Sequence, residues 1–194
     1  MIATRHGNTP VKKGDKLCGT RIIPLVIEKE KMQRVHELCG DEPLLQLLPY
    51  KIKKAAVLAT GSEVFHGRIK DTFTPVLEKK LAEFNVEVVY KQVLDDKPEQ
   101  ITAAIKTAIE EKGAEMVLCT GGMSVDPDDR TPLAIKNTGA RIVSYGAPVL
   151  PGAMFLLSYY GEKQVPVLGL PGCVMYAKRT VFDLVLPRVL ACDI

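Results

Sequence analysis

The sequence predicts an α/β fold in which a mostly parallel sheet lies between two layers of helices, with a small β-rich appendage at the N-terminus. From Ala55 onward, short apolar runs alternate with segments of helical length, as this fold requires. Most of these runs lack polar alternation, which is typical of strands covered on both faces. The 194 residues suffice for one such domain and an appendage, and are too few for two full domains.

Four apolar runs are predicted to be the strands of this sheet: residues 55–59, 86–93, 116–119 and 165–170. The second run carries Glu87 and Lys91, which predicts an edge strand. The uncharged stretch 142–161 is interrupted by Pro148 and Pro151, so we expect buried loop and strand there and no membrane-spanning helix.

Apolar residues recur at helical spacing in three stretches of the same domain. Ile101, Ile105 and Ile109 predict a helix that ends near Gly113. The other two helices are marked by Leu77, Leu81 and Phe84, and by Val174, Ala177, Val181 and Leu184, the last one ending at Pro187.

The first 51 residues are predicted to form a unit of their own, followed by a domain over residues 52–194. Turn signals between Ile2 and Glu28 indicate a small β ribbon, and a helix is expected from Glu28 to Cys39, with Gly40 as its stop. A linker is expected over residues 42–54.

Charge and cysteine content exclude several classes of function. Residues 1–54 hold 11 Lys/Arg against 6 Asp/Glu, but Tyr50 is their only aromatic residue, so no nucleic-acid partner is expected. The 5 cysteines form an odd set without a CxxC pair, which fits neither a zinc site nor a disulfide framework. Arg5 and Lys12 fall where a signal peptide would be apolar. We therefore expect a cytoplasmic protein without a membrane partner.

Glycine loops and acidic residues follow the predicted strands, where ligands bind in open parallel sheets. Gly61, Gly121, Gly122 and Gly172 leave backbone N–H groups free to hold an anion. Glu63, Asp95 and Asp129 could converge on a hydrated magnesium ion beside it. This combination indicates phosphoryl or nucleotidyl chemistry.

Structural roles compete with these functional ones at several positions. Asp96 and Glu99 fit a capping box for the helix through Ile101, and Asp95 is left without a local role. Thr131 before Pro132 is expected to be a helix N-cap. Two further interpretations stay open: Asp71 as a cap or a site residue, and Asp126 and Asp128 as residues that shape a turn with Pro127.

An ordered set of motifs resembles the molybdopterin-binding domain of molybdenum-cofactor biosynthesis proteins, over about residues 52–192. Gephyrin, molybdopterin adenylyltransferase and molybdopterin molybdenumtransferase share this domain. The motifs are Thr60-Gly-Ser-Glu63, Gly67 to Asp71-Thr72, Asp95-Asp96, Thr120-Gly-Gly-Met-Ser124 to Asp129-Arg-Thr131, Pro151-Gly152 and Leu170-Pro-Gly172. The resemblance also implies that residues 1–51 are the tail of a truncated upstream module.

The resemblance implies which residues hold which part of the ligand. It places a divalent cation such as Mg²⁺ on Glu63, Asp95 and Asp129, which would also be the catalytic residues. The residues that it assigns to molybdopterin are Gly121, Gly122 and Ser124 in a phosphate loop, Pro171 and Gly172 in a pterin-side loop, and Gly61, Ser62, Pro151 and Gly152 around them. A homo-oligomer, dimer or trimer, is expected.

Three functions follow from these features. The first is molybdopterin binding with a divalent cation in late cofactor biosynthesis, as an adenylyl- or molybdenum-transferase. The second is a non-catalytic carrier or sensor of the cofactor, favoured because Ala153 stands where the molybdenumtransferases have lysine. The third is a nucleotide pyrophosphatase of the competence-damage-inducible type, whose glycine loop also ends like Asp128-Asp129-Arg130-Thr131. Two other departures from the family pattern are Phe73 in place of asparagine and Cys173-Val174 in place of Asn-Pro.

Overall fold

The computed structural model describes residues 1–21, 23–124, 126 and 129–194, which form two compact units, 1–49 and 50–194. In the first unit, β1 (Ile2–Thr4) pairs antiparallel with β2 (Cys18–Thr20), which confirms the predicted ribbon. Helix α1 (Lys29–Cys39) follows, and the Gly40 N–H donates to the His36 carbonyl at its end. None of the residues of α1 is buried within this unit.

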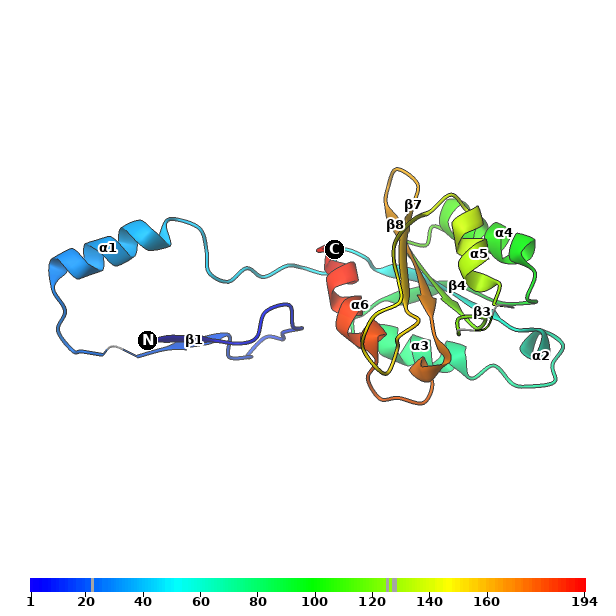
Figure 1. Ribbon diagram of the computed structural model, residues 1–194, viewed down its shortest axis with the longest axis horizontal. Helices are drawn as coiled ribbons and strands as arrows, with labels where there is room; N and C mark the ends of the chain where they lie inside the picture. Colours follow the sequence, from blue (N-terminus) through cyan, green and yellow to red (C-terminus); the bar gives the residue numbers. More distant parts are fainter. Residues whose placement is uncertain (22, 125, 127–128) are drawn as a thin grey trace. The chain divides into compact units, whose positions relative to one another are not determined.

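The second unit contains a sheet of six strands in the order β4-β3-β5-β8-β7-β6 (Figure 1). Strands β3 (Lys54–Thr60), β4 (Glu87–Leu94), β5 (Met116–Thr120) and β8 (Val165–Leu170) pair in parallel and correspond to the predicted strands. Strand β4 is an edge strand, as Glu87 and Lys91 indicated. Antiparallel β7 (Leu156–Tyr160) and β6 (Arg141–Tyr145) extend the other side of the sheet. The stretch expected to be buried is thus only partly so, since every residue of β6 is exposed at the second edge.

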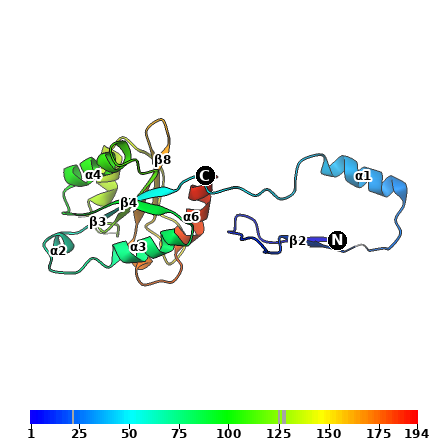
Figure 2. The ribbon, with the colours of Figure 1, turned by 180° about the vertical axis from the view of Figure 1, so that it is seen from behind.

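Helices cover both faces of this sheet and make three layers (Figures 1 and 2). Helices α4 (Pro98–Glu110) and α5 (Thr131–Asn137) bury one face with residues such as Ile105 and Ile135. Helices α3 (Phe73–Ala82) and α6 (Val181–Ala191) bury the other with residues such as Leu77 and Phe182. No helix in the described part of the chain has the length and hydropathy needed to cross a bilayer.

The end of the chain differs from the prediction in two ways. The segment after β8 forms a short 3₁₀ helix, η1 (Gly172–Val174), and α6 begins only at Val181. The N-cap Thr180 and Asp183 form a capping box there, which starts α6 at this point. Pro187 lies inside α6 and does not end it. Val189, Leu190 and Ala191 after Pro187 are buried, and this packing outweighs the one backbone hydrogen bond that proline removes.

A buried ion pair joins α3 to the start of α6. Lys80 Nζ lies 2.5 Å from Asp183 Oδ1, and these side chains are 9% and 3% exposed. Lys80 also donates to the Lys178 carbonyl at 3.2 Å, and the Thr180 N–H donates to Asp183 Oδ2 at 2.7 Å. Asp183 Oδ1 also lies 3.3 Å from Nη1 of the exposed Arg179, so Lys80 is its buried counter-charge, and each buried charge is stabilised by the other.

Replacing Lys80 with alanine is expected to lower the free energy of unfolding by about 3 kcal/mol, because Asp183 then stays buried without its main counter-charge. Urea unfolding followed by circular dichroism measures the change. The matched control is Lys79→Ala on the exposed side of the same helix, which should stay within about 0.5 kcal/mol of the parent. Equal effects of the two substitutions would contradict the prediction.

Cys119 is fully buried in β5, and this burial raises the pKa of its thiol to about 12. A thiolate is needed for alkylation, so Cys119 should resist iodoacetamide at pH about 8 in the folded protein. Cys18, Cys39 and Cys192 are exposed and should react. Peptide mass mapping before and after denaturation measures the protection, and labelling of Cys119 in the native protein would contradict this assignment.

Candidate functional site

The candidate site lies where the parallel strands end, at one edge of the sheet. Thr60 at the end of β3 is level with Leu94 of β4, and Thr120 at the end of β5 is level with Leu170 of β8. The register also pairs Thr120 with Ala59 of β3. The predicted loops therefore begin at the same edge, as the parallel arrangement required.

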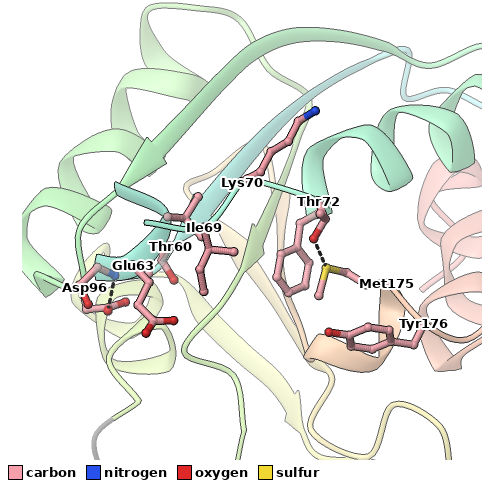
Figure 3. Close-up of a pocket in the computed structure, with 12 residues that line it drawn as sticks. Thr60, Glu63, Ile69, Lys70, Thr72, Asp96, Met175 and Tyr176 are labelled. Atoms are coloured by element: carbon pink, nitrogen blue, oxygen red, sulfur yellow. Dashed lines mark hydrogen bonds between the residues drawn. The ribbon is translucent and has the colours of Figure 1, made fainter. Parts of the chain in front are cut away.

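A cleft of about 500 Å³ opens at this edge (Figure 3). One wall comes from the end of β3 and from α2 (Ser62–Phe65), and the other from the start of α3 and the turn after η1. The lining residues are Thr60, Gly61, Ser62, Glu63, Val64, Ile69, Lys70, Thr72, Phe73, Asp96, Met175 and Tyr176.

The α2 wall is fixed by hydrogen bonds to the end of β4. The Gly61 N–H donates to the Leu94 carbonyl at 3.1 Å, and the Ser62 N–H donates to Asp96 Oδ2 at 2.8 Å. The predicted capping box of Asp96 and Glu99 is therefore wrong. The N-cap of α4 is Lys97, without a side-chain bond, because the Asp96 carboxylate is used across the cleft wall instead.

The opposite wall is held by the start of α3 and by the segment that follows η1. Asp71 Oδ1 accepts the Phe73 N–H at 2.9 Å and the Thr74 N–H at 3.1 Å, so Asp71 takes the capping role, one of its two open interpretations. The Thr72 hydroxyl donates to Met175 Sδ at 2.8 Å and ties the two segments together. Tyr176 is 85% exposed at the mouth of the cleft.

The glycine loop after β5 is joined to β3 by two threonine hydroxyls. Thr131 Oγ1 donates to the Gly121 carbonyl at 2.8 Å and lies 3.1 Å from Thr60 Oγ1. Thr60 in turn donates to the Thr120 carbonyl at 3.0 Å. Thr131 was expected to cap α5, which is wrong: the N-cap is Arg130, and the buried hydroxyl of Thr131 binds the loop.

Gly121 is required at its position by both conformation and contact. Its φ is +86°, and a Cβ there would lie 2.0 Å from the Thr60 carbonyl oxygen. Gly122 has a φ of +52°, and its Cβ would lie 3.1 Å from Thr131 Oγ1. The loop backbone thus lies directly against a residue that lines the cleft.

Ser124 and Asp129 close the far end of this loop. Asp129 Oδ2 accepts both the Ser124 N–H and the Ser124 hydroxyl, the latter at 2.9 Å. The Asp126 N–H donates to Ser124 Oγ at 3.2 Å. Partial burial, and then the charge of Asp129, raise the pKa of Tyr145 at the end of β6. The turn expected at Pro127 and Asp128 lies outside the described residues.

Asp95 has local partners, contrary to the expectation that it had none. Its Oδ2 lies 3.2 Å from Lys97 Nζ, and its Oδ1 accepts the Asp96 N–H at 3.0 Å. The hydrogen bond from Lys97, and then the bond from the Asp96 N–H, lower the pKa of Asp95 from its usual value. Asp95 is not among the residues that line the cleft.

The three carboxylates predicted to hold magnesium have different surroundings. Asp95 binds Lys97, Asp129 binds Ser124, and Glu63 faces the cleft. Within the described ranges, no group of three His, Cys, Asp or Glu side chains could hold a metal ion. The cation site therefore stays a prediction.

The two Pro-Gly pairs have different positions. The Pro151 carbonyl accepts the Val181 N–H at 3.1 Å, and a Cβ on buried Gly152 would lie 3.1 Å from Val181, so this pair packs against α6. Pro171 is the N-cap of η1, and exposed Gly172 follows it. The second pair therefore leads into the cleft wall, and no described hydrogen bond ties the first to the cleft.

Sequence reasoning missed the apolar lining of the cleft and Tyr145. Ile69 and Phe73 lie within or directly after the Gly67-to-Thr72 motif, and Met175 follows the Leu170-Pro-Gly motif. Their nearness to these motifs was the available signal. No local sequence signal pointed to Tyr145. It lies near Asp129 because β6 runs parallel to β8, two strands away, and so ends at the same edge of the sheet.

Comparison with known proteins supplies a family. Residues 56–191 match the family model described as "Probable molybdopterin binding domain". A competence-damage inducible protein of Bacillus velezensis is 36% identical over 89 residues, covering 46% of this chain and 21% of that protein. A molybdopterin molybdenumtransferase of Synechococcus elongatus is 27% identical over 198 residues, covering 97% of this chain and 47% of that protein. The chain thus spans less than half the length of either relative.

A solved structure shares the fold. The molybdopterin biosynthesis enzyme MoaB from Thermus thermophilus has a TM-score of 0.60 and 23% sequence identity. The match covers 73% of this chain and 96% of that chain. The predicted three-layer α/β arrangement with a mostly parallel sheet is confirmed by this similarity and by the strand order.

Gly121→Ala should cost far more stability than Gly139→Ala, although the two glycines have φ values of +86° and +88°. At Gly139 a Cβ meets nothing within 4 Å, so only the backbone cost of about 1 kcal/mol applies. At Gly121 the overlap with the Thr60 carbonyl should raise the cost above about 3 kcal/mol. Urea unfolding compares the two variants, and similar midpoints would show that the loop does not need this close approach.

Proposed function

Because the chain belongs to the molybdopterin-binding domain family, we propose that residues 50–194 bind molybdopterin or its adenylylated form at this sheet edge, in late molybdenum-cofactor assembly. The single observation that carries the proposal is the continuity of the cleft with the glycine loop through Thr60. Thr60 lines the cleft, its Oγ1 lies 3.1 Å from Thr131 Oγ1, and its carbonyl faces Gly121. A flat ring in the cleft and a phosphate at the loop would then belong to one ligand.

The two ends of the site suit the two ends of such a ligand. Ile69, Phe73 and Met175 supply apolar surface for a ring. Gly121 and Gly122 have left-handed backbone conformations without side chains, which lets backbone N–H groups approach phosphate oxygens. This division supports a ligand with a planar apolar body and an anionic tail.

A divalent cation fits this proposal, but with fewer protein ligands than the three carboxylates that were predicted to bind it. Mg²⁺ usually keeps several waters and takes one or two carboxylates together with substrate phosphate. Asp129 lies in the glycine loop, and the hydrogen bonds that its carboxylate accepts from the described residues go to Oδ2. We propose Asp129 as the cation's protein ligand. The bound cation would neutralise phosphate charge.

Transfer chemistry, cytoplasmic location and an assembly of two or three copies stay predictions. A cofactor carrier without activity is the first alternative, supported by Ala153 after Gly152. A second alternative is nucleotide hydrolysis of the competence-damage-inducible type, favoured by the similarity to the Bacillus velezensis protein.

Isothermal titration of the chain with molybdopterin tests the proposal. One site per chain is expected, tighter with Mg²⁺ than with EDTA because the cation offsets the phosphate charge. Asp129→Asn should lose this cation dependence, whereas Asp193→Asn at the C-terminal end of the chain should keep it. Absence of binding with and without Mg²⁺ would refute the proposal, and mass spectrometry of products with ATP or ADP-ribose distinguishes transferase, carrier and hydrolase.

A further inference from the structure

Building on the proposed function, we infer that Glu63 selects the ring of the ligand by its hydrogen-bond donors. The cleft would take a heterocycle with a 2-amino-4-oxo pyrimidine edge. The Glu63 carboxylate would accept one hydrogen bond from the 2-amino group and a second from the neighbouring ring N–H. This gives Glu63 a role in specificity in place of the role in metal binding that the family resemblance implies.

The Glu63 side chain is available for this contact. It lines the cleft, it is exposed, and its carboxylate has no hydrogen bond or ion pair with the described residues. Figure 3 shows the Glu63 carboxylate and the Tyr176 hydroxyl facing the cleft from opposite sides. A ring placed between them would meet the carboxylate at one edge.

The negative charge of the cleft wall around Glu63 disfavours phosphate and favours hydrogen-bond donors of the ligand. Glu63 and Asp96 both stand on it, so an anionic group here would face like charge. The Ser62 N–H, which an anion could use at the start of α2, is already bound to Asp96. Lys70 is the one cation among the described lining residues, and its ammonium group points away from Glu63 and Tyr176 in Figure 3. The N–H edge of a neutral ring therefore suits this wall better than the phosphate tail.

The rest of the cleft is shaped in advance for a planar group. The backbone of Phe73 is held by the bond from its N–H to Asp71, and the Met175 side chain accepts a bond from the Thr72 hydroxyl. Phe73 and Met175 are only partly exposed. A ring resting on them would need little rearrangement of the wall, so its orientation would be set by the polar contact at Glu63.

The chemistry of the edge determines which rings are accepted. A carboxylate has two acceptor oxygens and no donor, so it matches two parallel N–H donors. Pterins and guanine present this pair as a 2-amino group beside a ring N–H. Lumazine has a carbonyl at position 2 in place of the amino group, and adenine places a ring acceptor beside its amino group. Each of these rings would leave a carboxylate oxygen without its donor.

The test compares 6-hydroxymethylpterin with 6-hydroxymethyllumazine, in which a carbonyl replaces the 2-amino group, by fluorescence titration. The chain should bind the pterin about 10- to 100-fold more tightly. Glu63→Gln should reduce this preference to below about 3-fold, because the amide nitrogen then faces the ring donors. The matched control is Glu99→Gln, on the exposed surface of α4 outside the cleft, which should keep the preference.

Two further measurements keep the inference separate from the proposed function. GMP should compete about 10-fold better than IMP, which lacks the 2-amino group, and this comparison needs no variant. In the molybdopterin titration, Glu63→Gln should keep the Mg²⁺ dependence. Equal affinity of the parent chain for pterin and lumazine would overturn the inference, even if the chain binds molybdopterin. An unchanged preference for pterin in Glu63→Gln, or a loss of the Mg²⁺ dependence in that variant, would overturn it too. If the parent chain binds neither the pterins nor molybdopterin, both proposals fail.

Discussion

The close approach of the Gly121 loop to the end of β3 is the constraint on which the site depends. The loop backbone lies so near the Thr60 carbonyl that no side chain fits at Gly121. The approach leaves the hydroxyls of Thr60 and Thr131 buried, and each donates to a loop carbonyl, Thr60 to Thr120 and Thr131 to Gly121. A buried hydroxyl without a partner would cost about 1–3 kcal/mol, so these bonds also prevent other placements of the loop. The cleft and the glycine loop are adjacent because of this contact.

The second wall of the cleft is positioned from a distance by the core. Lys80 joins α3 to Asp183 at the start of α6, and Asp183 also binds Thr180 in the capping box. Helix α3 begins at the wall, where Asp71 binds its first N–H groups. The ion pair and the cleft wall are therefore connected through one helix, which contributes Lys80 to the core and Phe73 to the cleft.

The sequence predicted the four parallel strands and the layered arrangement of the sheet, but not the separate strands β6 and β7 or the partners of the polar side chains. Strands were predictable because burial on both faces leaves a local apolar run, as in 116–119 and 165–170. Asp96 and Thr131 were misassigned because local spacing suggested caps. Their real partners, Ser62 and Gly121, are brought near by the fold. Pro187 was misread for a related reason, since the burial of the residues after it keeps α6 helical.

Local sequence could not predict the partners of the three carboxylates either. Position after a strand predicts that a residue reaches the common edge, but not the direction of its side chain. Asp95 follows an edge strand, where Lys97 lies in solvent two residues away and neutralises it. Asp129 follows a central strand and is held by the loop that it closes. Glu63 sits in the first turn of a four-residue helix whose leading N–H is already bound to Asp96, so its charge stays uncompensated and faces the cleft. The same sequence pattern thus gives three different results: Asp95 forms an ion pair, Asp129 accepts hydrogen bonds within its loop, and Glu63 is left as a free acceptor. Each carboxylate takes its role from the neighbour that the fold places beside it.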